Sequence, residues 1–358
     1  MKKALFKSLN RIISPIKKIK SRQFPYKIEV IAENLTVPWA LDISNDGKIY
    51  FTERAGSVRV IENGILNPRP LITFSPPFIS QGEGSLMGIA LDPNFSQNHY
   101  IYIMHSYREN NILFNRVVRL VEINNIATID KILIDKIPGN QVHNGGRIKI
   151  GPDKKLYITT GDAQNPSLAQ NMSSLAGKIL RIELNGNIPR DNPFPNSPIY
   201  SLGHRNPQGL TWSHRNILYS SEHGQTAHDE INIIIPGANY GWPLVQGDET
   251  STEITVQKPL VHSNEITWAP SGMAFINSGP FKDNLLIATL RGQQLLSLSL
   301  NNNGTVVTNI ESLLKNEYGR LRDVVQAKDG SIYITTSNRD GRGNPTTSDD
   351  RIIRLVPS

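Results

Sequence analysis

The chain of 358 residues is 38% hydrophobic and 19% charged, as expected for a globular protein with a large core, and it contains no cysteine. Disulfides, thiolate metal sites and cysteine nucleophiles are therefore excluded, and no run reaches the roughly 18 apolar residues of a transmembrane helix. The formal net charge of +7 is concentrated in the basic first 22 residues. The rest lacks the aromatic-studded basic stripe that binds single strands, so no nucleic-acid partner is expected.

Residues 1–24 form a basic N-terminal tail. They begin like a signal peptide, but Lys7, Arg11 and Pro15 interrupt the apolar segment, whereas an export signal has an unbroken apolar region of about 7–15 residues. A basic segment that contains Leu and Ile can also lie on an anionic membrane surface. We therefore expect either a poor export signal or a membrane-surface segment.

One pattern recurs six times in the remaining chain. Each copy has Asn, Asp or Gly suited to a tight turn, followed by β-branched and aromatic residues suited to a strand. A spacing of roughly 45–70 residues is that of a propeller blade with loop insertions. The copies cover residues 45–53, 95–106, 152–162, 214–224, 281–292 and 328–338.

The repeat predicts an all-β protein, a six-bladed β-propeller of four-stranded blades over residues 25–358. Ring closure then requires the first and last strands to share a blade. Two β-sandwich domains are the alternative, but no Pro/Gly/Ser-rich linker divides the chain. Loops at one end of a propeller hold the site, so we expect the residues that end the repeats to line the channel mouth: Glu53, His105, Asp162, Glu222, His223 and Arg291.

His143 lies in a Gly-rich, turn-like part of QVHNGGRIKIGPDKKLYITTGDA, and Asp162 ends the strand expected after it. Imidazole accepts a proton near neutral pH, and a carboxylate partner fixes its tautomer. The two residues are therefore a candidate catalytic pair. The alternative is that Asp162 caps a turn and His143 bonds to backbone.

Arg205 and Asn206 precede a proline in SLGHRNPQGL, which favours a loop. A guanidinium there can hold a carboxylate through two parallel hydrogen bonds. The alternative is a loop arginine that donates to backbone carbonyls.

Residues 220–243, SSEHGQTAHDEINIIIPGANYGWP, combine Glu222, Asp229 and Glu230 with flexible backbone around Gly224. Carboxylate and carbonyl oxygens in adaptable geometry suit Ca²⁺. The spacing excludes an EF-hand, and the histidines lack a known zinc spacing. A solvated acidic turn is an equally good interpretation.

In GRLRDVV, Arg320 and Arg322 lie two residues apart on an expected strand and would project from one face. Two adjacent guanidiniums repel each other unless an anion lies between them. The pair indicates a polyanionic ligand or, alternatively, an exposed strand edge. Arg291 would join the pair if the last two blades are neighbours.

Together these stretches resemble the glucose/sorbosone dehydrogenase family, soluble six-bladed quinoprotein aldose dehydrogenases that use pyrroloquinoline quinone (PQQ). The similarity runs in family order from about Val37 to Leu355. The motifs that carry it are VPWALDISNDGKIYFTERAGSVRVIENG, GEGSLMGIALDPNF, HNGGRIKIGPDKKLYITTGDA, LAGKILRIELNGNIPRDNPF, GHRNPQGL, SEHGQTAHDEIN with NYGWP, WAPSGMAF and GRLRDVVQAKDGSIY.

The resemblance implies a role for the candidate catalytic pair. His143 matches the catalytic base, which takes the proton of the anomeric hydroxyl as hydride leaves C1 for PQQ. Asp162 matches the carboxylate that supports this histidine. Gly145 and Gly146 would let the loop pass close to the cofactor.

The resemblance also implies the binding residues. Arg205 would serve catalysis too, as a fixed donor to negative charge that develops on the quinone carbonyls. The carbonyls of Gly224 and Gln225 match ligands of a Ca²⁺ ion that bridges to PQQ, although Gln225 replaces a frequent proline and Arg291 a usual lysine. The positions that match cofactor-binding residues are Glu83, Arg205, Asn206, Arg291, Arg320 and Arg322.

The resemblance thus implies an enzyme that oxidises aldose sugars to lactones with PQQ and Ca²⁺. Electrons would pass to a diffusible acceptor, since the chain has no haem motif such as CxxCH. We expect a monomer or loose homodimer, located in the periplasm or cell envelope as in the family. The alternatives are a calcium-dependent propeller lactonase (a hydrolase) with His143 as base, and a non-enzymatic binding propeller; neither needs the arginines.

Overall fold

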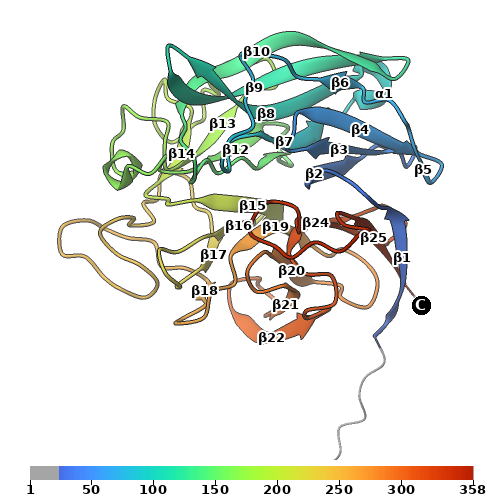
Figure 1. Cartoon of the computed structure of the whole chain (residues 1–358). Helices are drawn as coiled ribbons and strands as arrows, with labels where there is room; N and C mark the ends of the chain where they lie inside the picture. The colour runs from blue at the N-terminus through green and yellow to red at the C-terminus, as the bar shows by residue number, and fades with distance from the viewer. Residues whose placement is uncertain (1–23, 358) are drawn as a thin grey trace, which may run out of the picture.

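The computed structural model describes residues 24–357, which form a ring of six antiparallel sheets (Figure 1). Each sheet is one blade of a β-propeller, which confirms the predicted fold. From the channel outwards, blade 1 consists of β2 (Pro38–Ile43), β3 (Ile49–Glu53), β4 (Ser57–Glu62) and β5 (Ile65–Leu66), and blade 2 of β7 (Leu86–Leu91), β8 (Tyr100–Glu109), β9 (Ile112–Ile123) and β10 (Ile126–Pro138). In the same order, blade 3 consists of β11 (Ile148–Ile150), β12 (Leu156–Thr160), β13 (Lys178–Ile182) and β14 (Ile199–Leu202), and blade 4 of β15 (Pro207–Trp212), β16 (Leu218–Glu222), β17 (Glu230–Ile233) and β18 (Val261–His262). Blade 5 consists of β19 (Pro270–Phe275), β20 (Asn284–Thr289), β21 (Gln294–Leu300) and β22 (Val307–Leu313), and blade 6 of β23 (Leu321–Gln326), β24 (Ile332–Thr336), β25 (Ile352–Pro357) and β1 (Tyr26–Ala32).

Three short elements complete the described part of the chain. Strand β6 (Ile72–Thr73) pairs with β4 in blade 1. The helix α1 (Phe95–Asn98) and the 3₁₀ helix η1 (Pro166–Ala169) lie in loops. The innermost strands β2, β7, β11, β15, β19 and β23 contact their neighbours around the ring.

The ring closes within blade 6. Strand β1 is antiparallel to β25, with Tyr26 opposite Pro357 and Ala32 opposite Ile352, and the two strands lie side by side in Figure 1. The first and last strands therefore share a blade, as predicted, and the two-sandwich alternative is wrong. Residues 1–23 lie outside the described part, so the tail hypothesis stays a prediction. No helix within residues 24–357 has the length and apolar character needed to span a membrane.

The repeated sequence pattern forms the second strand of each blade, not the strand that lines the channel. Strands β3, β12, β16 and β24 are buried along their whole length, because sheets of neighbouring blades cover both of their faces. β-branched and aromatic residues suit such strands. The large core cluster around Trp39, Leu86 and Ile158 accordingly joins blades 1, 2 and 3.

This position corrects three of the predicted mouth residues, since Glu222 is buried against His204. The carboxylate of Glu53 accepts the backbone N–H of Thr36 at 2.7 Å and pairs with Arg59. His105 is fully buried, with its ring 4.8 Å from that of Phe74. None of the three residues lines the central cavity, because the ends of second strands lie one layer back from the channel.

Candidate active site

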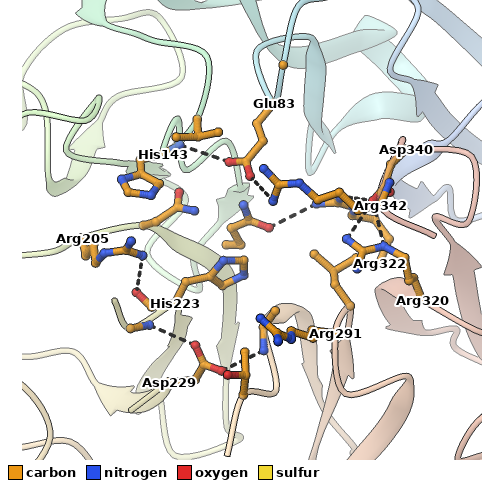
Figure 2. A pocket seen from close by; sticks show the side chains of 18 of the residues that line it. Glu83, His143, Arg205, His223, Asp229, Arg291, Arg320, Arg322, Asp340 and Arg342 are labelled. Carbon is orange, nitrogen blue, oxygen red and sulfur yellow. Dashed lines mark hydrogen bonds and ion pairs between the residues drawn. The ribbon is translucent and has the colours of Figure 1, made fainter. Parts of the chain in front are cut away.

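A cavity of 690 Å³ lies at one end of the channel (Figure 2). Two sets of loops build it, because both the connections that enter blades and the turns that follow second strands end there. The entering connections place Glu83, His143, Arg205 and Arg320, and the turns place Arg54, Gly224, Arg291 and Asp340.

The structure brings His143 and Asp162 together. Nδ1 of His143 lies 2.8 Å from Oδ1 of Asp162, which is buried. An ionised carboxylate can only accept, so Nδ1 carries the proton and Nε2 keeps its lone pair. The other Asp162 oxygen accepts the indole N–H of Trp242 at 2.9 Å. The arrangement suits a general base whose free nitrogen is Nε2.

Close backbone packing shapes the loop that carries His143. The residue itself has a φ of +60°, a conformation that non-glycine residues adopt at functional sites more than elsewhere. A Cβ on Gly161 would collide with the His143 carbonyl, and one on Gly145 would lie 2.6 Å from the Thr159 carbonyl oxygen. Gly145 and Gly146 do not line the large cavity; they let the loop pack against β12 and Met87, and the expectation that they lie close to the cofactor stays a prediction.

Arg320 and Arg322 share a single carboxylate. Nη2 of Arg320 lies 2.9 Å from Oδ2 of Asp340, and Nη2 of Arg322 lies 3.4 Å from the same oxygen. Arg322 also donates to Oε1 of Gln208 at 3.2 Å. Figure 2 shows this cluster on one side of the cavity and His143 with Arg205 on the other.

The arginine cluster is electrostatically strained. Burial lowers the pKa of Arg322 to about 9 despite the nearby Asp340 carboxylate, and the charges of Arg54 and Arg320 add to this shift. Burial also lowers the pKa of Arg54. Burial opposes ionisation of Asp340, but Arg322 and Arg320 outweigh it and lower the pKa of that carboxyl. One carboxylate thus compensates several guanidiniums, and an anion in the cavity would relieve their repulsion.

Glu83 connects the arginine cluster to the loop of His143. One carboxylate oxygen pairs with Nη1 of Arg342 at 2.8 Å, and the other accepts the backbone N–H of His143 at 3.1 Å. Burial works against ionisation, but Arg342 in particular lowers the pKa of Glu83 below its ordinary value. Glu83 therefore stays charged and holds both loops.

Arg205, Asn206 and Arg291 also line the cavity. The Arg205 guanidinium lies 5.3 Å from the Trp242 ring centroid, and its buried Nε has no hydrogen-bond partner within residues 24–357. Oδ1 of Asn206 accepts the backbone N–H of Gly145 at 3.0 Å. Arg291 is exposed at the mouth.

Gly224 and Gln225 border the cavity with their backbone. Their N–H groups donate to Asp229 at 3.0 Å and to Gln246 at 3.4 Å. In the described part of the chain neither carbonyl oxygen accepts a hydrogen bond. That part also contains no group of three or more His, Asp or Glu residues arranged for a metal. A cation here would need further oxygens from a ligand.

The sequence analysis missed several residues of the cavity. Arg54 directly follows the first repeat, and Asp340 and Arg342 follow the sixth within a few residues. Extending each repeat into the turn after it would have found all three. Trp242 lies in the NYGWP motif, which the resemblance had singled out without a role.

Comparison with known proteins identifies the family. The family model for Glucose / Sorbosone dehydrogenase matches residues 35–353. The chain belongs to this family. An aldose sugar dehydrogenase of Escherichia coli is 31% identical over 344 residues, 88% of this chain and 91% of that protein. Quinoprotein glucose dehydrogenase B of Acinetobacter calcoaceticus is 36% identical over 270 residues, 65% of this chain and 55% of that protein.

A solved structure agrees with this assignment. The PQQ-bound aldose sugar dehydrogenase of Streptomyces coelicolor has a TM-score of 0.84 and 34% identity, over 92% of this chain and 98% of that one. The predicted family is therefore confirmed, and the chain is an oxidoreductase of the sugar dehydrogenase type.

Proposed function

We propose that this protein is a quinoprotein that oxidises the anomeric C1 hydroxyl of aldose sugars to lactones, with PQQ as the hydride acceptor and His143 as the general base. One observation carries the proposal. A cavity whose lining carries an excess of positive charge lies directly beside a histidine whose Nε2 is free to accept a proton.

The charges of the cavity fit PQQ, which has three carboxylates. Six arginines line the cavity against three acidic residues, which leaves a surplus of three positive charges with both histidines neutral. We propose that Arg54, Arg320 and Arg322 hold carboxylates of PQQ, with Arg291 and Arg342 at the mouth and Asn206 beside the ring. Glu83 holds Arg342 and the base loop.

The backbone at Gly224 and Gln225 fits a Ca²⁺ ion bound together with PQQ. Two neutral carbonyl oxygens are too few for Ca²⁺, which takes six to eight oxygens. Ligand and water oxygens would have to complete the shell. We therefore expect Ca²⁺ to bind tightly only in the presence of PQQ.

The protein's own residues would then perform the proton chemistry. When bound, PQQ supplies a two-electron acceptor for hydride. Nε2 of His143 takes the proton of the C1 hydroxyl, and Asp162 stabilises the resulting imidazolium. Arg205 offers fixed donors near the reacting centre. The sugar would occupy the adjoining cavity of 350 Å³, which shares His143, Arg205 and Gln225 with the larger one.

We further propose that the enzyme acts in the periplasm or cell envelope as a monomer or loose homodimer, and passes electrons to a diffusible acceptor. The arginine surplus supports this function over a calcium-dependent lactonase or a binding propeller. Hydrolysis of a lactone needs no anion site of this charge.

Titration of EDTA-treated protein with PQQ, with and without Ca²⁺, tests the proposal when it is followed by dye reduction with a panel of aldoses. We expect saturable, Ca²⁺-dependent PQQ binding and sugar-driven dye reduction. Folded protein that binds no PQQ would contradict the proposal, and lactone hydrolysis with Ca²⁺ alone would favour the lactonase.

The variant His143→Gln tests the base. Removing a general base costs about 10²–10⁴ in rate, so we expect kcat to fall by that factor while the Kd for PQQ stays within a few-fold. His214→Gln is the matched control, because His214 is exposed beside Asp283 and away from the cavity. Unchanged kcat in His143→Gln would rule out His143 as the base.

A further inference from the structure

The NYGWP motif, residues 239–243, lies in the connection between β17 and β18 of blade 4, yet it is fastened to blade 3. Asn239 forms a parallel bridge with Leu202 at the end of β14. The amides of Asn239 and Gln170 donate to each other at 2.7 and 3.0 Å. Gln170 also donates to the Trp242 carbonyl at 2.7 Å. The motif is thus a clasp between two blades.

The clasp places Trp242 in the wall of the smaller, adjoining cavity, beside His143 and Asp162. The side chain is only 8% exposed, and its indole N–H donates to Oδ2 of Asp162 at 2.9 Å. Its ring lies 5.3 Å from the guanidinium carbon of Arg205. One indole therefore contacts both the partner of the proposed base and the proposed catalytic arginine.

We propose that Trp242 is a positioning residue for the His143–Asp162 pair. Indole is only a donor, so it holds the carboxylate in the orientation that leaves Oδ1 for Nδ1–H of His143. The backbone N–H of Gln164 donates to Oδ1 at 2.9 Å, and Trp242 is the side chain that holds Oδ2. Its ring face favours the charged guanidinium of Arg205 through a cation–π contact.

The consequence for the site is a fixed tautomer. With Oδ2 held, Asp162 accepts from Nδ1, and the lone pair of His143 stays on Nε2, toward the cavity. Without the indole N–H, only the backbone N–H of Gln164 still holds the carboxylate, so its contact with Nδ1 loosens and the Nε2–H tautomer becomes accessible. That tautomer cannot accept a proton at Nε2. The effect on turnover rests on the proposed function, whereas the effect on the tautomer does not.

Trp242→Phe tests the proposal because phenylalanine keeps a ring beside Arg205 but has no N–H. In cofactor-free protein with ¹⁵N-labelled histidine, NMR should show His143 as the Nδ1–H tautomer in the wild type and as a mixture in Trp242→Phe. In PQQ-loaded enzyme kcat should fall about tenfold, the worth of one hydrogen bond to a charged group. The Kd for PQQ should stay within about threefold, because Trp242 does not line the larger cavity.

Two further variants complete the experiment. Trp212→Phe is the matched control: Trp212 packs against Tyr157 with ring centroids 5.0 Å apart and lines neither cavity. Gln170→Leu breaks the clasp without changing the indole, and we expect the same change in tautomer, smaller in extent. This variant replaces Trp242→Phe in the experiment if Trp242→Phe does not fold.

Each outcome is decisive. If Trp242→Phe, or Gln170→Leu in its place, keeps the wild-type tautomer, Trp242 only packs and the proposal is wrong. A changed tautomer with an unchanged kcat and an unchanged pH profile of kcat would also overturn it. If the tautomer changes but the wild type oxidises no sugar, the positioning role holds and the proposed function fails.

Discussion

Two buried arginines beside Trp39 differ in how their charges are compensated. The guanidinium carbons of Arg147 and Arg322 lie 4.5 and 5.6 Å from the Trp39 ring centroid. Arg147 has its own carboxylate, with Nη1 at 2.9 Å from Oδ2 of Asp323. Arg322 shares Asp340 with Arg320. Burial lowers the pKa of both arginines, but Arg322 also faces other guanidiniums.

The two pairs also differ in what surrounds them. Asp323 of blade 6 accepts the backbone N–H of Leu41 of blade 1 at 3.0 Å. Arg147, just before blade 3, donates to the Gln208 carbonyl of blade 4 at 2.9 Å. Four blades thus meet at one paired charge, whereas the arginines around Arg322 line an open cavity. The balanced charge in the channel links four blades, and the unbalanced cluster at its mouth is where we propose that an anion binds.

Arg147→Met should show the largest effect. It leaves Asp323 buried without its counter-charge, so we expect the free energy of unfolding to fall by about 3–5 kcal/mol, as measured by urea denaturation. The double variant Arg147→Met with Asp323→Asn should recover much of this loss, because an uncompensated charge costs more than the pair contributes. No loss in the single variant would contradict the structural role.

Arg322→Ala should instead weaken PQQ binding without lowering the stability of the protein. Removing one surplus cation should leave the urea midpoint unchanged or slightly raised. The Kd for PQQ should weaken about a hundredfold, since a desolvated charge pair contributes roughly 2–5 kcal/mol. Arg351→Ala, at the edge of blade 6 and outside the cavity lining, is the control. A destabilised Arg322→Ala protein with unchanged PQQ affinity would abolish the distinction between the two arginines.

Local sequence predicted the architecture well because turn and strand chemistry repeats in every blade. The repeat did not predict the channel-lining residues equally well, because its β-branched residues mark the second strand of each blade, which is buried on both faces. The innermost strands line the channel and have a more mixed composition, as in β15, PQGLTW. The prediction that Glu53, His105 and Glu222 line the mouth is therefore wrong.

The candidate site was predicted only where a local motif carries it. His143 and Asp162 lie 19 residues apart, and the structure joins them at 2.8 Å. The contacts of Trp242 with Asp162, 80 residues away, and of Arg342 with Glu83 depend on ring closure and on a loop that crosses between blades. No local pattern encodes such distances, so only the folded ring shows which carboxylate serves which cation.

A pair of buried carboxylates beside the site sharpens the comparison, because carboxylates can shed their charge. Glu222 and Glu230 are register partners on β16 and β17. Glu222 has partners in His204, at 2.8 Å, and in the backbone N–H of Arg205. Burial raises the pKa of Glu230 to about 8, and the charge of Glu222 adds to the shift. A guanidinium cannot respond in this way, since it keeps its proton, so its charge must be compensated by an anion, either within the protein, as Asp323 does for Arg147, or from a ligand.

The smallest effect that we expect is on the pH dependence of thermal stability, and it follows from the raised pKa of Glu230. Glu230 holds a proton in the folded state up to a pH of about 8, whereas in the unfolded chain it ionises near its ordinary value. The folded state thus binds more protons between these two values, so its stability falls as the pH rises through them. Glu230→Gln removes this contribution, and the melting temperature of cofactor-free protein should drop less between pH 5 and pH 9 than in the wild type, by a few degrees.

Glu311→Gln, a change at an exposed glutamate on β22, is the control and should show the same pH dependence of the melting temperature as the wild type. If Glu230→Gln also shows the wild-type pH dependence, Glu230 is ionised in the folded protein. The contrast between buried carboxylates that become neutral and arginines that stay charged then does not hold.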